Sequence, residues 1–289
     1  MGLIGLISTV IIGQSAMGSW PLVWSPDIHI SGFFGHFISP EALTLGMISI
    51  ALLTGLPLLA ILFIGTKLIF RYKSNNTAIT LGMVGVWLVA LMTLIFVSAG
   101  QVGNYKSQTT LTNTETIVCD PCPTLYIKLG EDKYSDYYEV DWDIDPFKVV
   151  NVNGENVMLG QPLFDIEPSG TDEIVMVFRK RARGKNHDDA VQNIQDIVYH
   201  FQVTDSLITL DPWFLTGPES KWRDQRLDVI LKMPVGKTVH LDEKLEEIIH
   251  DIDNVTNILD EEMVGKFWTM KPEGLTLKQD SASVAVITP

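Results

Sequence analysis

Two uncharged stretches decide the fold: ALTLGMISIALLTGLPLLAILFIGT over residues 42–66 and TAITLGMVGVWLVALMTLIFVSAG over residues 77–100. They are 25 and 24 residues long and contain no acidic or basic side chain. About 20 apolar residues are enough to cross a bilayer as a helix. Because backbone groups in lipid need partners within their own segment, the two stretches predict a membrane hairpin with helices over about residues 42–70 and 77–100.

Charge divides the chain near Gly103. Residues 1–103 carry three basic and two acidic residues, and residues 104–289 carry the other 18 basic and 33 acidic residues, net −15. The second part is long enough for a domain with its own hydrophobic core. Its acidity argues against nucleic acid or an anionic lipid surface as a partner. We therefore expect a transmembrane region over residues 1–103 and a soluble domain after it.

The N-terminal segment GLIGLISTVIIG, residues 2–13, is a third apolar stretch. It lacks a basic leader and a clear small-x-small cleavage site, which favours a membrane helix over about residues 2–20 rather than a signal peptide. Both interpretations stay open, as does a chain that is part of a longer protein. An aromatic, Pro-rich segment over residues 17–41 is typical of the membrane interface.

A cationic turn predicts the orientation of the hairpin. Lys67, Arg71 and Lys73 flank the short connection between the two apolar stretches. Basic residues in short loops are retained in the cytoplasm. The turn is therefore predicted to be cytoplasmic, and residues 104–289 to be extracytoplasmic. The uncharged helix cores offer no carrier for a proton relay or an ion path, so transport is not expected.

A polar stretch and a cysteine pair follow the hairpin. Residues 104–118 lack hydrophobic periodicity and predict a linker. Outside the cytoplasm, the pair Cys119 and Cys122 is either a disulfide or a redox site. A strand-like segment follows the pair where a thioredoxin-type motif would open a helix, which favours a local disulfide or two free thiols. The chain has no further cysteine for a zinc site.

Residues 119–289 predict a β-rich domain with a flexible C-terminal tail. Short segments rich in β-branched and aromatic residues recur every eight to twelve residues, as in an all-β sandwich or a β-solenoid. One helix is expected over NHDDAVQNIQDI, residues 186–197, capped by Asn186, and a second short helix over residues 242–249. The strand-like segments are TLYIKL, FKVVNV, ENVMLG, LFDI, EIVMVFRK, IVYHFQV, SLITL, RLDVILKM and TVHLD.

An acidic segment, YYEVDWDIDP over residues 137–146, suggests a cation site. On a strand, its four acids from Glu139 to Asp145 would share one face. Calcium binding is one interpretation, but positions six and twelve counted from Asp141 are Pro146 and Val152, which excludes an EF-hand loop. A solvated strand face is the simpler interpretation, as it is for residues 251–254, and no metal is predicted.

The basic run RKRARGK is the best candidate for a binding patch. Its cations could bind an anionic glycan, a lipid headgroup or an acidic partner, or they could pair with acids of their own domain. No hydrolase elbow, metalloprotease pair, phosphate-binding loop or dinucleotide pattern occurs in the sequence, so we predict no catalytic residue and no cofactor. The five cations are Arg179, Lys180, Arg181, Arg183 and Lys185.

Several segments carry a resemblance to a known family. Residues 55–96 resemble the membrane region of the phage shock protein C-like proteins of Bacteroidetes. Four segments are similar to the C-terminal extracytoplasmic domain of these proteins, and the resemblance spans most of residues 40–270. The N-terminal module that defines the family is absent from the sequence, so a truncated or split relative is expected. The four segments cover residues 173–203, 205–214, 221–243 and 250–257.

The resemblance implies an envelope-stress role and a domain related to adhesin-like β-solenoids, and it supplies no site residues. Our prediction is a non-enzymatic, integral protein of the bacterial inner membrane with a periplasmic β-rich domain that binds other envelope proteins. The alternative is a membrane-tethered adhesin-like or ligand-binding module. Nucleic acid is not expected as a partner, and the ligand is not predicted.

Overall fold

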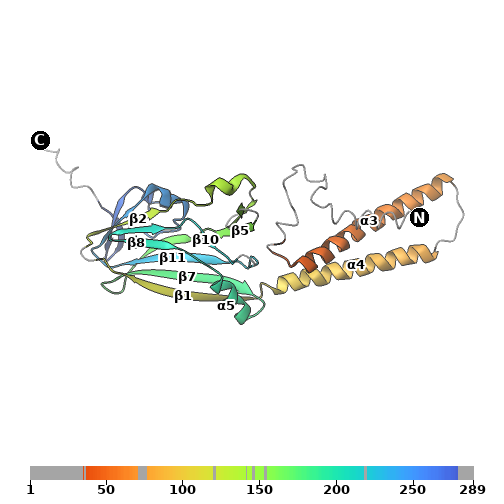
Figure 1. Cartoon of the computed structure of the whole chain (residues 1–289), viewed down its shortest axis with the longest axis horizontal. Coiled ribbons are helices and arrows are strands. Elements are labelled where there is room, and N and C mark those ends of the chain that lie inside the picture. Colours follow the sequence, from red (N-terminus) through yellow and green to blue (C-terminus); the bar gives the residue numbers. More distant parts are fainter. Residues whose placement is uncertain are drawn as a thin grey trace. The chain divides into compact units, whose positions relative to one another are not determined.

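A computed structural model describes residues 35, 37–70, 77–119, 122–140, 142–144, 147–152, 155–217 and 220–278 (Figure 1). The chain divides after Val102 into two compact units, which are described separately below. Several predictions concern residues outside the described ranges. They are the helix over residues 2–20, most of the interfacial segment, the C-terminal tail after residue 278, and the basic residues Arg71 and Lys73.

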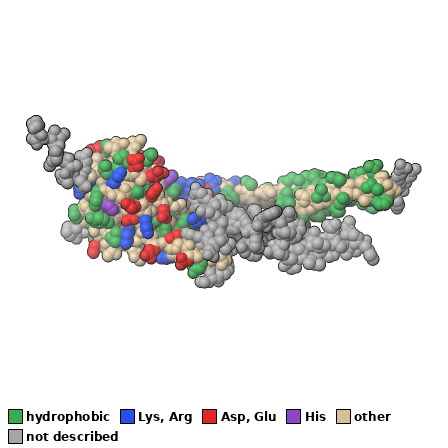
Figure 2. All heavy atoms as spheres, turned by 90° about the horizontal axis from the view of Figure 1, so that it is seen from above, with side chains coloured by type: hydrophobic (Ala, Val, Ile, Leu, Met, Phe, Trp, Pro, Cys, Tyr) green, Lys and Arg blue, Asp and Glu red, His purple; other side chains and the backbone are tan. Residues whose placement is uncertain are grey.

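The first unit contains two long apolar helices, α3 (Pro40–Phe70) and α4 (Thr77–Gly103), which confirms the predicted helix pair. Both helices are long and apolar enough to cross a membrane. Their side chains are mostly hydrophobic and exposed (Figure 2), as expected for a surface that faces lipid rather than water. The indole Nε1 of Trp87 donates a hydrogen bond of 3.2 Å to the carbonyl oxygen of Leu53 and so links the two helices.

The second unit is β-rich and contains three sheets, which confirms the predicted fold class. The first sheet has four strands, and its central pair β7 and β11 is antiparallel. β11 also pairs in parallel with β6, and β1 pairs with β7 along eleven residues. In order across the sheet, the strands are β1 (Ser107–Ile117), β7 (Ile174–Gly184), β11 (Arg226–Met233) and β6 (Leu163–Pro168).

The second sheet has six strands and joins segments that are far apart in sequence. β2 lies in parallel between β9 and β12, and its alternating Leu125, Ile127 and Leu129 are buried. In order, the strands are β14 (Gly274–Leu277), β13 (Phe267–Lys271), β12 (Thr238–Leu241), β2 (Thr124–Leu129), β9 (Leu207–Leu210) and β8 (Phe201–Thr204).

The third sheet has four strands, and the domain has two α-helices and two 3-10 helices within its described residues. The sheet order is β10 (Phe214–Leu215), β5 (Glu155–Gly160), β4 (Phe147–Val152) and β3 (Trp142–Ile144). The helices are η2 (Ser135–Val140), α5 (His187–Gln195), η3 (Glu243–Glu247) and α6 (Asp260–Met263).

The predicted linker over residues 104–118 is wrong for most of its length. Residues 107–117 form β1, which pairs antiparallel with β7 from Ser107 opposite Gly184 to Ile117 opposite Ile174. Only Asn104, Tyr105 and Lys106 separate α4 from this strand. Most side chains of β1 are exposed, so the strand has no buried face and its sequence shows no apolar alternation. Backbone pairing with β7 therefore determines its structure.

Other local predictions are confirmed. The bounds of β2, β4, β5 and β11 agree with the predicted segments, and α5 begins after Asn186, whose side chain accepts a hydrogen bond from the Asp189 backbone N–H. The predicted strand over residues 197–203 is wrong at its start, since β8 begins at Phe201. The second predicted helix is a 3-10 turn, η3, capped by Asp242.

Candidate functional site

Strand geometry separates the basic run RKRARGK into two faces. Arg179, Arg181 and Arg183 alternate on β7 with Lys180 and Ala182, and successive side chains of a strand point to opposite faces. Ala182 is buried on the inner face, and the three arginines remain partly exposed on the outer face. Of the five cations in the predicted patch, three arginines therefore share the outer face of β7, and Lys185 follows the end of the strand.

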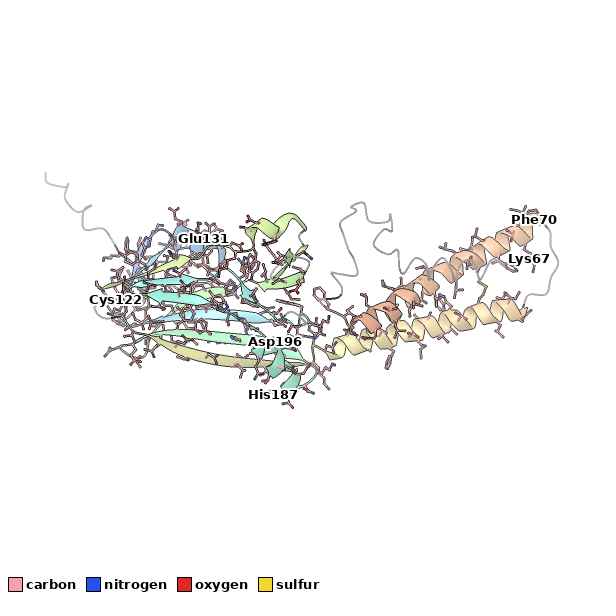
Figure 3. The ribbon with its side chains drawn as sticks, in the orientation of Figure 1. Lys67, Phe70, Cys122, Glu131, His187 and Asp196 are labelled. Atoms are coloured by element: carbon pink, nitrogen blue, oxygen red, sulfur yellow. A yellow bond between two sulfur atoms is a disulfide. The ribbon has the colours of Figure 1, made fainter. Side chains whose placement is uncertain are left out.

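Lys180 supports the helix on the inner face. Its ammonium group donates a hydrogen bond of 2.7 Å to the carbonyl oxygen of Ile197, just after α5. Burial lowers the pKa of Lys180, because the charged form loses water. Figure 3 labels His187 and Asp196 at the two ends of α5. A cation at a helix C-terminus satisfies free carbonyl groups, so Lys180 has a structural role there.

The strand register places a further arginine beside the row. Arg226, the first residue of β11, lies directly opposite Arg181 of β7. On the other side of β7, Gln108 of β1 lies opposite Arg183 and Thr110 opposite Arg181. Like charges directly opposite each other on neighbouring strands destabilise a sheet. The sheet therefore holds Arg181 and Arg226 in an unfavourable juxtaposition on its outer face.

Two carboxylates partly neutralise the arginines. Asp224 accepts hydrogen bonds from Arg183 Nε at 3.0 Å and from Arg226 Nε at 3.1 Å. Asp228 accepts one from Arg181 Nη2 at 2.9 Å and lies 3.7 Å from Arg179 Nη1. Four arginines and two aspartates leave a local excess of positive charge in a domain whose net charge is strongly negative.

A small pocket opens among these side chains. It has a volume of about 180 Å³ and is lined by Gln108, Arg181, Arg183, Asp224 and Arg226. Arg181 Nε is buried and makes no hydrogen bond within the described part of the chain. An unsatisfied buried donor costs about 1–3 kcal/mol, so this guanidinium is incompletely compensated by its protein neighbours. A guanidinium presents five N–H donors in a fixed plane and suits carboxylate and phosphate oxygens.

Aromatic packing fixes the segment that carries Asp224. The Trp222 ring stacks on Phe147 with centroids 4.5 Å apart, and the Trp222 carbonyl oxygen accepts a hydrogen bond of 2.9 Å from the Tyr105 hydroxyl. Asp224 has a φ of 55°, in the left-handed region. This conformation, which Asp tolerates better than most residues, holds the carboxylate between Arg183 and Arg226. The wall of the pocket is therefore preorganised.

The cysteine pair lies at the start of β2. Cys119 and Cys122 form a disulfide with a Cα–Cα distance of 5.4 Å. Cys122 is buried, and its carbonyl oxygen accepts a hydrogen bond of 3.1 Å from Lys237 Nζ. A strand follows the pair, so the helix N-terminus that activates a redox thiol in thioredoxin-type motifs is not found at this position.

The acidic segments do not assemble a cation site among the described residues. Glu139 belongs to the 3-10 helix η2, which corrects the expected strand, and Asp141 and Asp145 lie outside the described ranges. No group of three or more His, Cys, Asp or Glu within those ranges could hold a metal.

Asp165 of β6 lies opposite Ile230 of β11. Burial raises the pKa of its carboxyl to about 6, and neighbouring acids, including Asp251 and Asp253, add to the shift.

Of the three predicted topology determinants, Lys67 lies within the described residues. It occupies the last turn of α3, at the same end as Phe70 (Figure 3).

The sequence did not single out three residues that line the basic pocket, namely Gln108, Asp224 and Arg226. Their position beside the arginines of β7 depends on pairing between strands more than 40 residues apart in the sequence. A single sequence carries no local signal for such pairing.

Comparison with known proteins gives two matches that cover separate parts of the chain. Residues 1–105 match the PspC transmembrane region, and residues 150–282 match the ToastRack domain found in some PspC proteins. No curated protein and no solved structure matches the chain significantly. The two matched regions coincide with the apolar helix pair and with most of the three-sheet domain, whose architecture fits a Toast-rack fold. The chain is therefore a PspC-related membrane protein with a C-terminal ToastRack domain.

Proposed function

We propose that this protein is a non-catalytic, regulatory component of the envelope-stress response, with its ToastRack domain outside the cytoplasm and in contact with other envelope proteins. The observation that carries the proposal is the presence of a PspC transmembrane region and a PspC C-terminal domain in one chain. The three-sheet domain offers a folded surface on which a partner could bind.

Two features support the extracytoplasmic location. Lys67 at the end of α3, together with Arg71 and Lys73, makes the turn of the hairpin basic, and basic short loops are retained in the cytoplasm. A single membrane crossing by α4 then carries the chain from the turn to the opposite side of the membrane. The Cys119–Cys122 disulfide suits an oxidising compartment.

Removal of residues 104–289 tests the stress role. Cells producing the intact chain, the shortened chain at matched membrane levels, or neither are exposed to a membrane-depolarising agent. A reporter of the phage-shock response and attachment to a surface are measured in parallel. We expect the shortened chain to alter the reporter response and to leave attachment unchanged.

The opposite result would favour the alternative of a tethered adhesin-like module. Lost attachment with an unaltered stress response would contradict the proposal. The basic pocket on β7 favours the ligand-binding alternative, because three of its five lining residues are arginines.

A further inference from the structure

We propose that the pocket formed by Gln108, Arg181, Arg183, Asp224 and Arg226 binds a phosphate group. The inference goes beyond the proposed stress role and does not depend on it. Its basis is a juxtaposition of arginines that the fold enforces and that nearby acids leave partly uncompensated.

Two of the arginines form a cross-strand pair. Arg181 and Arg226 are directly opposite each other in the antiparallel pairing of β7 and β11. Two guanidinium groups in this position repel each other, and the repulsion weakens the sheet. An anion between them turns this repulsion into two attractive interactions. Binding of an anion thereby relieves the repulsion between the two guanidinium groups, and this relief contributes to the affinity for the anion.

Several N–H donors around the pocket remain available to a ligand. Arg226 contacts Asp224 through Nε, and Arg183 uses Nε with Asp224 and Nη1 with the Tyr105 carbonyl oxygen. The remaining Nη groups of both side chains, together with the Gln108 amide, can donate to a ligand. The described contacts of Arg181 engage Nη2 and leave its buried Nε without a partner.

The size and accessibility of the pocket also suit a phosphate group. The pocket volume of about 180 Å³ is below the range of about 300–1,000 Å³ usual for drug-sized ligands, which suits a phosphate group. The side chains of Arg181, Arg183 and Arg226 are 32%, 40% and 49% exposed. They are accessible from solvent, yet held in place by Asp224 and Asp228.

A planar fork of N–H donors distinguishes phosphate from a simple halide. Charge-assisted guanidinium–phosphate contacts are frequently bidentate, and three converging guanidinium groups match the several oxygens of a phosphate. A free phosphate and a lipid headgroup share this chemistry. The domain as a whole is acidic, so a lipid surface would be recognised through this pocket and not through general electrostatic attraction.

Calorimetric titration of the full chain in neutral detergent micelles tests the proposal. One titrant is inorganic phosphate against sodium chloride of equal ionic strength. The other is short-chain phosphatidylglycerol against short-chain phosphatidylcholine. The test variant is the double substitution Arg181→Gln and Arg226→Gln. The matched control is Arg179→Gln, which removes a charge from the same face of β7 at a residue that does not line the pocket.

We expect the double substitution to weaken binding by about tenfold or more, the factor that corresponds to losing one charge-assisted hydrogen bond. The control should change affinity by about threefold at most, because its charge is partly screened by solvent. Binding of inorganic phosphate identifies a soluble source, and binding of phosphatidylglycerol alone identifies a lipid source. Either result supports the pocket if it depends on Arg181 and Arg226.

Two outcomes would overturn the proposal. One is the absence of binding to both titrants, and the other is equal weakening by the control and the double substitution. A second variant, Arg181→Lys with Arg226→Lys, keeps both charges and removes the planar forks. It should also weaken phosphate binding, and retained affinity in this variant would contradict recognition by guanidinium geometry. The double lysine variant preserves the net charge of the sheet, so it can still be titrated if the double glutamine variant unfolds.

Discussion

Gly184 lies where the backbone of α5 passes over the end of β7. A Cβ atom at this position would overlap the backbone nitrogen of Ala190, and backbone cannot move aside as a flexible side chain does. The helix is attached to the same place by Asn193, whose side-chain amide donates a hydrogen bond of 2.8 Å to the Arg183 carbonyl oxygen. The absence of a side chain at Gly184 therefore lets α5 cover the inner face of the first sheet.

Gly184→Ala should lower the free energy of unfolding of the β-rich domain by about 1–3 kcal/mol, as expected for overpacking in a close contact. Chemical unfolding followed by tryptophan fluorescence measures the change. Gly170→Ala is the matched control, since a Cβ atom there meets nothing within 4 Å. Equal shifts in the two variants would show that α5 does not lie closely against β7.

Asp165 makes the stability of the domain depend on pH. Its folded pKa, about 6, is above its ordinary value of 3.8, so the folded state holds more protons than the unfolded state between these values. Stability from this group is therefore fully present below about pH 4 and is lost as the pH rises through about 6. The penalty above pH 6 is about 1 kcal/mol after allowance for solvent screening.

Asp165→Asn should therefore raise the unfolding midpoint at pH 7.5 and leave it nearly unchanged at pH 4. Thermal unfolding at the two pH values measures the difference. Asp172→Asn, in an exposed turn, controls for the loss of one negative charge from an acidic domain. A stabilisation of the same size at both pH values would argue against burial of the Asp165 carboxylate.

At the scale of elements, β1 is more than a connection. It pairs with β7 along eleven residues, and β7 would otherwise be the edge of its sheet. An unpaired long edge strand exposes a row of backbone donors and acceptors and promotes aggregation. β1 also contributes Gln108 to the basic pocket. The stretch expected to be a linker is thus part of both the fold and the candidate site.

Two shortened forms test the contribution of β1. A form with residues 103–278 should unfold cooperatively, whereas one with residues 119–278 should unfold at a lower denaturant concentration or aggregate, since β7 loses its outer neighbour. Circular dichroism and size-exclusion chromatography provide the measurements. Identical unfolding midpoints for the two forms would refute the pairing of β1 with β7.

Some strands could be predicted from the sequence and others could not, and the difference has a physical reason. β2, β4, β5 and β11 combine apolar side chains with clear turn residues, and their bounds were predictable. β1 is rich in Thr and exposed along most of its length, so it carries no periodic apolar signal. The arginines of β7 were visible as a run, but the position of Arg226 opposite Arg181 depends on long-range register.

At the scale of the whole molecule, the chain joins an apolar membrane region to an acidic β-rich domain. The proposed topology, with Lys67 on the cytoplasmic side and the domain outside, follows from the charge of the turn. The disulfide is compatible with this proposal, because reducing systems of the cytoplasm keep most cysteine pairs open.

Site-directed cysteine labelling tests the topology. In a background carrying Cys119→Ser and Cys122→Ser, Val118→Cys places a thiol at a residue that is 85% exposed. A membrane-impermeant maleimide should label it in intact spheroplasts. Phe70→Cys, at the end of α3, is the control for the other side of the membrane and should be labelled only after permeabilisation. The reverse pattern would place the β-rich domain in the cytoplasm.

The brevity of the connection between Gly103 and Ser107 has a consequence for how this protein meets its partners. A fifteen-residue tether could extend to roughly 50 Å, whereas the three residues between α4 and β1 span about 10 Å. The connection itself can therefore add no more than about 10 Å between the end of α4 and the start of β1. If the envelope partners that we propose are embedded in the same bilayer, their encounters with this protein are confined to two dimensions, where weak affinities suffice for occupancy. A freely diffusing partner receives no such advantage and must come to the membrane.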